Sequence, residues 1–125
     1  CSASLASLNV LIDEKLIEQS KEKGKVLEKE LLKWQKDFPE LISYISTKGL
    51  VAAVFFVKEG TNELDIELVD SLIYRAMLKG VNSVRTLSGT IKLGPPLSIP
   101  EDALSEAIDV YKECLIELLE EKNNA

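Results

Sequence analysis

The chain has 125 residues, 46% of them hydrophobic, and a formal net charge of −6, which predicts one domain with a modest core. The acidic balance and the lack of a basic cluster argue against nucleic acid and anionic membranes as partners, since both require cations that neutralise phosphates. The absence of histidine excludes Ser-His and Cys-His catalysis and most transition-metal sites.

The two ends of the composition argument concern cysteine and the first residue. Cys1 and Cys114 are too few and too far apart for a disulfide framework or a zinc cluster, so we expect a cytoplasmic chain in which Cys114 is a partly buried hydrophobe. No apolar run is long enough to span a bilayer. Because the sequence opens on Cys1 in what reads as mid-helix, we expect it to be a piece of a longer polypeptide.

The first 36 residues are expected to be helical. Apolar residues recur at helical spacing from residue 2 to residue 13, and the charged cluster 13–15 should bend or break the helix. Gly24 costs about 1 kcal/mol of helix stability relative to alanine, so we expect another segment to approach it closely. The second stripe has steps of three or four residues and comprises Leu16, Ser20, Gly24, Leu27, Leu31 and Trp34.

Two strands should follow, since Pro39 ends the helix. Residues 42–47 predict a weak strand, residues 50–57 the strongest strand of the chain, and Lys48-Gly49 a tight turn between them. The strand at 50–57 is apolar on both faces, so it should be covered on both sides. We do not expect a chain this short to supply both covers.

A third helix and a second hairpin complete the middle of the chain. The helix should bury Ile66, Val69, Ile73 and Ala76, with Asn62 or Asp65 as its N-cap and Gly80 as its C-cap. Residues 83–87 and 90–93 are short strand candidates joined through Ser88-Gly89.

A corner at residues 94–100 leads into the last helix. Pro95 and Pro96 have no backbone donor and fix φ, so neither a central strand nor a helix can continue through them. Pro100 and Glu101 are signals of a helix start. The final helix has the clearest period: Leu104, Ile108, Tyr111, Leu115 and Leu118. The order helix, hairpin, helix, hairpin, helix predicts an α+β fold, a small antiparallel sheet of two hairpins packed with amphipathic helices.

Three segments carry a family resemblance. Residues 91–99, Ile-Lys-Leu-Gly-Pro-Pro-Leu-Ser-Ile, follow the pattern Ile-Arg-Leu-x-Pro-Pro-Leu-x-Ile, and they are preceded by the strand start 48–51 and the Gly-Val step at 80–81. On these residues nearly the whole chain resembles the C-terminal small domain of class III, fold-type I aminotransferases, which depend on pyridoxal 5'-phosphate.

The resemblance implies that residues 1–125 form one C-terminal small domain, with residues 1–36 as a connecting helix. A large domain that binds most of the pyridoxal phosphate would precede Cys1, so this chain is expected to hold no cofactor and no catalytic residue and to be inactive alone. The parent enzyme would use an amino-group donor and a 2-oxo acid, and it would be a homodimer or another homo-oligomer.

The resemblance also marks one substrate-binding candidate. Lys92 stands where the family usually has an arginine, which typically engages the substrate carboxylate or a neighbouring acidic side chain. Lysine keeps the charge but loses the planar bidentate fork. A solvent-exposed strand lysine is an equally weighted interpretation of Lys92. Arg85 is a weaker candidate, for which a surface charge is the favoured interpretation.

Two further functions stay open at the level of sequence. One is a stand-alone α+β ligand-binding or regulatory module, because this fold class hosts many such functions. The other is an interaction domain whose contact surface is the doubly apolar strand and the first helix.

Overall fold

A computed structural model describes all of residues 1–125 as four helices and one four-stranded antiparallel sheet. The α+β class and the order helix, hairpin, helix, hairpin, helix are confirmed, with the first helical region divided in two. The elements are α1 (Ser2–Asp13), α2 (Leu16–Asp37), β1 (Ile42–Lys48), β2 (Val51–Phe56), α3 (Ile66–Leu78), β3 (Val84–Arg85), β4 (Ile91–Leu93) and α4 (Glu101–Asn124).

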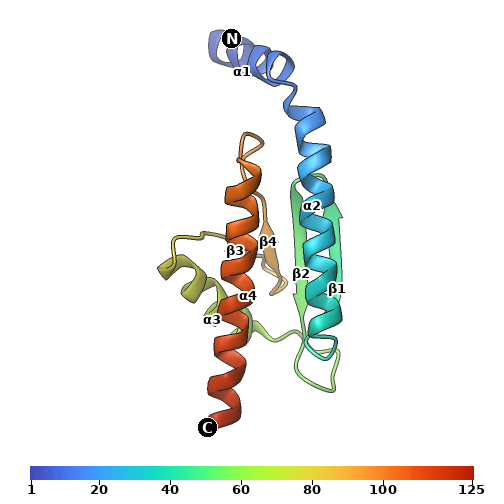
Figure 1. Ribbon diagram of the computed structural model, residues 1–125, viewed down its shortest axis with the longest axis vertical. Coiled ribbons are helices and arrows are strands. Elements are labelled where there is room, and N and C mark those ends of the chain that lie inside the picture. The colour runs from blue at the N-terminus through green and yellow to red at the C-terminus, as the bar shows by residue number, and fades with distance from the viewer.

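The expected break at residues 13–15 is present between α1 and α2. Lys15 adopts a left-handed conformation with φ 51° and is the only residue other than glycine with positive φ. Helix α1 therefore leaves the line of α2 and extends beyond the end of the sheet (Figure 1). It buries none of its residues. None of the helices has the combination of length and apolarity needed to cross a bilayer.

The sheet has the strand order β1-β2-β4-β3, and all its pairs are antiparallel. Helices α2 and α4 lie over the same face of the sheet (Figure 1), and the buried side chains of α3 join the same core. Strand β2 shows the resulting asymmetry, because Val54 is fully buried on the helix face whereas Val51, on the other face, is 50% exposed. The chain thus forms two layers, with one face of the sheet left open.

Gly24 confirms the expected close approach to α2. A Cβ atom at Gly24 would lie only 2.5 Å from the carbonyl oxygen of Gly49, in the turn between β1 and β2. The missing side chain therefore lets the helix backbone rest directly on this turn. Gly49 has a φ of 55°, which favours glycine at the turn as well.

Some details differ from the sequence-based expectations. Strand β3 contains only Val84 and Arg85, because the turn begins at Thr86, whose amide donates to the carbonyl of Thr90. In α3 the buried residues are Val69, Leu72 and Ala76, so Ile66 is not part of the core face. Asp65 is the N-cap as expected, since its carboxylate accepts a hydrogen bond from the amide of Leu68.

Candidate functional site

Lys92 lies in the middle of β4, on the face of the sheet that carries no helix. Consecutive strand residues point to opposite faces, so Ile91 is directed into the core, where it is 1% exposed, while Lys92 is exposed. The alternation of apolar and charged residues in Ile91-Lys92-Leu93 is what turns this ammonium away from the helices. The ammonium makes no ion pair or hydrogen bond with another residue of the chain.

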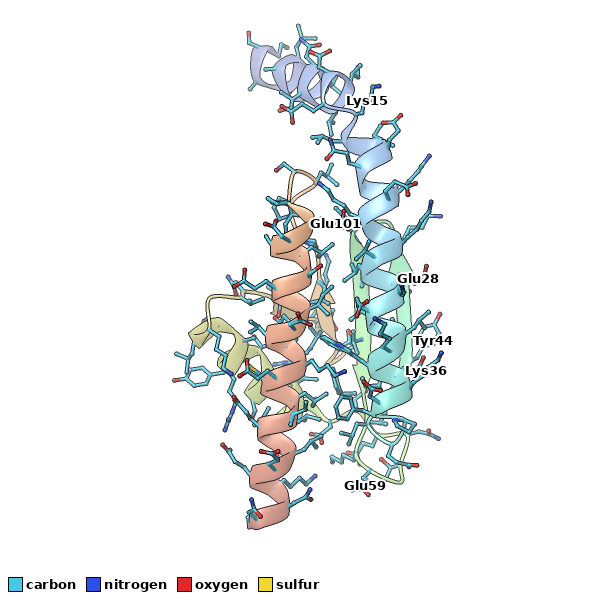
Figure 2. The ribbon with its side chains drawn as sticks, viewed as in Figure 1. Lys15, Glu28, Lys36, Tyr44, Glu59 and Glu101 are labelled. Carbon is cyan, nitrogen blue, oxygen red and sulfur yellow. The ribbon has the colours of Figure 1, made fainter.

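Apolar side chains surround Lys92 on this face. Ala53 of β2 and Val84 of β3 are its register partners on the two sides. Towards β1, Tyr44 and Phe55 form a tilted aromatic pair with ring centroids 5.6 Å apart, and Tyr44 projects from the sheet next to β1 (Figure 2). We call this surface the open face; it comprises Tyr44, Val51, Ala53, Phe55, Val84 and Lys92.

The open face can bind an anion once water is excluded from it. A single cation among apolar side chains attracts a carboxylate weakly in bulk water but much more strongly in a medium of low dielectric constant. As the surface stands in this chain, water reaches Lys92 freely. The arrangement therefore needs a second protein surface across it to become a selective site.

Arg85, the other candidate cation, lies on the opposite face of the sheet. Its register partner is Ile91, and its Nε donates a hydrogen bond of 2.6 Å to Oδ1 of Asp70 in α3. Arg85 thus ties β3 to α3. Since the sheet separates Arg85 from Lys92, the two cations do not converge on a common ligand.

The residues of this chain do not fit a pyridoxal phosphate site. The lysine that binds this cofactor needs a desolvated pocket and a lowered pKa, but every lysine here is exposed or partly exposed. The lysines whose pKa departs from the usual value, Lys58 and Lys79, have it raised by hydrogen bonds to Glu63 and Glu117, respectively. We therefore assign no chemical step to this chain. No cluster of metal-ligating side chains is present either.

The sequence-based reasoning missed an ionic cluster between α3 and α4. Lys79 Nζ lies 2.7 Å from Glu117 and 3.2 Å from Glu113, and Arg75 pairs with Glu117 and Glu121. The hydrogen bond from Lys79 lowers the pKa of the Glu117 carboxyl. Spacings of four residues on both helices were the available signal, since they place each charge set on one helix face.

A cavity of about 660 Å³ was also missed. It lies beside β3 and β4 under the first half of α4, and Lys92 is among its lining residues. Tyr111 closes its floor, and the Tyr111 hydroxyl forms a hydrogen bond with Ser83. Burial raises the pKa of this tyrosine, so the hydroxyl stays protonated at neutral pH.

Comparison with known proteins follows the same segments of the chain. Residues 1–115 match the family described as aminotransferase class-III. The chain is 30% identical over 117 residues to 4-aminobutyrate aminotransferase of Mycobacterium leprae, covering 92% of this chain and 26% of that protein. It is 31% identical over 115 residues to the mitochondrial ornithine aminotransferase of Arabidopsis thaliana, covering 91% of this chain and 23% of that protein.

Solved structures show the same fold. Acetylornithine aminotransferase from Elizabethkingia anophelis superposes with a TM-score of 0.82 at 25% identity, over 94% of this chain and 28% of that one. The chain thus spans about a quarter of the length of the relatives that it matches.

Proposed function

The chain belongs to the class III aminotransferase family, and from that premise we propose that it forms the C-terminal small domain of an enzyme that depends on pyridoxal phosphate. In this proposal a large domain holds the cofactor, which supplies the chemistry of amino-group transfer between an amine or amino acid and a 2-oxo acid. The chain covers the active site with its open face and is inactive alone. The parent enzyme is a homo-oligomer.

The observation that carries the proposal is the position of Lys92 on the open face. It is a cation without a partner, flanked by Ala53 and Val84, on the only face of the sheet that the chain leaves uncovered. A large domain laid across this face would exclude water from Lys92 and strengthen its attraction for a substrate carboxylate. Lys92 would then act in substrate selection, as a point charge rather than a bidentate fork.

The first experiment tests the parent protein. The reading frame upstream of Cys1 should encode a large domain with a strand-borne lysine and a preceding aspartate. The native protein, detected by mass, should be about four times the length of this chain. A native protein of about one domain would contradict the proposal.

The second experiment tests Lys92 in the full-length enzyme. Lys92→Ala removes a charge-assisted hydrogen bond, which contributes roughly 1.5–3 kcal/mol, so KM for a donor with a carboxylate should rise about 10- to 100-fold. KM for the matching amine without a carboxylate should not change, and Lys92→Arg should restore carboxylate binding. Lys25→Ala, on the outer side of α2 where Lys25 pairs with Glu22, is the matched control.

The comparison of the two donors separates substrate binding from a structural role. If Lys92→Ala weakens both donors equally, or if Lys92→Arg does not rescue the carboxylate donor, then Lys92 does not select the substrate.

A further inference from the structure

The cavity beside β4 has a structural origin that leaves it empty of side chains. Strand β3 pairs only with Lys92 and Ile91, so the edge of β4 has no neighbouring strand beyond Lys92. The following Gly94 contributes no side chain, and a Cβ atom added there would meet nothing within 4 Å. On the opposite wall α4 presents Ala103 and Ala107. Small residues on both walls therefore keep the space open.

The size and lining of the cavity suit a small molecule. Its volume of about 660 Å³ falls within the range of roughly 300–1,000 Å³ that is typical of ligand pockets, which combine apolar walls with a few polar groups. The core residues Leu104, Ile108 and Tyr111 form an apolar floor. The lining elements β3, β4 and the first half of α4 lie together in the fold (Figure 1).

The charges around the cavity indicate which kind of molecule would fit. Lys79 is neutralised by Glu113 and Glu117, and the Tyr111 hydroxyl is bonded to Ser83. Two charged side chains of the lining have no ion-pair partner in the chain: Lys92 on the β4 wall and Glu106 on the α4 wall. The cavity thus combines an apolar floor with one free cation and one free anion on different walls.

We propose that this cavity binds a free amino acid with a large apolar side chain. Its carboxylate faces Lys92, its ammonium faces Glu106, and its side chain lies on the apolar floor. Charge-assisted hydrogen bonds are stronger than neutral ones, and a zwitterion satisfies both unpaired charges at once. An amino group engaged by Glu106 is not free to react, so this is an accessory site and not the place of amino-group transfer.

The proposal extends the proposed function in one respect that rests on it. An amino acid held in the cavity would engage Lys92 and so withdraw this cation from the substrate carboxylate. Binding at the accessory site would then lower the activity of the parent enzyme towards donors with a carboxylate. The binding itself does not depend on that activity and can be measured on the 125-residue chain.

The test is a titration of this chain followed by Trp34 emission and backbone amide shifts. The Trp34 ring is buried with its centroid 6.3 Å from that of Tyr111, so it reports on the cavity floor. L-Phenylalanine and L-leucine should bind with dissociation constants in the millimolar range or below. Glycine, 3-phenylpropionate and 2-phenylethylamine, which each lack one of the three features, should bind at least about tenfold more weakly.

Three variants locate the site. Gly94→Leu should abolish binding by filling the cavity, and the backbone of Gly94 is not in the left-handed region, so the variant should fold. Glu106→Gln should raise the dissociation constant about tenfold, while Glu59→Gln, in the exposed loop at the other end of the molecule (Figure 2), should leave it unchanged.

Several outcomes would overturn the accessory site. These are the absence of saturable binding by either apolar amino acid, equal binding of 3-phenylpropionate, and unchanged affinity in Glu106→Gln. None of them bears on whether the chain covers an aminotransferase active site, which the Lys92 variants of the full-length enzyme decide.

Discussion

Replacing Gly24 by alanine tests whether close packing or helix propensity dominates at the contact between α2 and the β1–β2 turn. A Cβ atom at this position would lie 2.5, 2.6 and 2.7 Å from the carbonyl oxygen, carbonyl carbon and Cα of Gly49. All three are backbone atoms, so no side chain can rotate to make room. The helix and the turn must move apart, although both are buried against the core.

Two opposing effects set the magnitude. Alanine in place of a helical glycine stabilises a helix by about 1 kcal/mol. Overpacking of a rigid contact typically costs about 1–3 kcal/mol, and the backbone clash at Gly24 places this variant at the upper end. We therefore expect Gly24→Ala to lower the free energy of unfolding by roughly 2 kcal/mol, which corresponds to a fall in Tm of about 6–10 °C for a domain of this size.

Urea denaturation followed by the fluorescence of Trp34 measures this change, because Trp34 is buried on the same helix. Gly94→Ala is the matched control, since its Cβ would meet nothing within 4 Å and it should be neutral or stabilising by a few tenths of a kcal/mol. If Gly24→Ala proved as stable as the parent chain, the close approach would not limit this position, and the reasoning would be refuted.

Three further predictions concern charge, burial and association. The pKa of Glu117 is lowered in the folded chain by the hydrogen bond from Lys79, so the stability difference between the parent chain and Glu117→Gln should be fully present at neutral pH. It should shrink as the pH falls below about 4.5, the usual pKa of the carboxyl; a difference independent of pH in urea titrations would contradict this. Burial raises the pKa of Cys114, so at pH 8 a thiol reagent should modify Cys1 rapidly and Cys114 only upon unfolding, and equal rates would contradict its burial. The exposed apolar side chains of α1 and the open face should make the chain self-associate, and deletion of residues 1–13 should weaken that association in sedimentation experiments without lowering stability, because α1 buries nothing; a strictly monomeric chain at high concentration would contradict it.

The helices and the longer strands were predictable because their signals are local. The stripe that includes Leu27, Leu31 and Trp34 is buried as expected, and the period of the last helix matches the buried residues of α4. Gly24 was informative because its cost to the helix needed a physical reason, which the contact with Gly49 provides. In each case one short window of sequence contained the relevant physics.

Features that depend on pairing between distant segments were not predictable in this way. The length of β3 is limited by the hydrogen bonds of the turn that starts at Thr86, and this short strand in turn leaves the edge of β4 open. The cavity follows from that edge together with small residues of α4, such as Ala107, that lie far along the chain. Arg85 and Lys92 were both candidate cations by sequence, and only the strand register shows that they lie on opposite faces.

Strand β2 connects the sequence pattern with the proposed function. Its apolar residues on both faces predict two covers, and the structure supplies one, because Val54 and Phe56 are fully buried while Val51 is half exposed. An apolar face that is exposed to water is unfavourable, so the sequence of β2 is better suited to a sheet with protein on both sides. Lys92 lies on that same face. If a second surface covers it, burial of an unpaired ammonium would be costly, and a carboxylate provided by a substrate or by the covering domain would remove this cost. The apolar pattern of β2 and the unpaired charge of Lys92 thus require the same missing cover, which is why the Lys92 variants belong in the full-length enzyme.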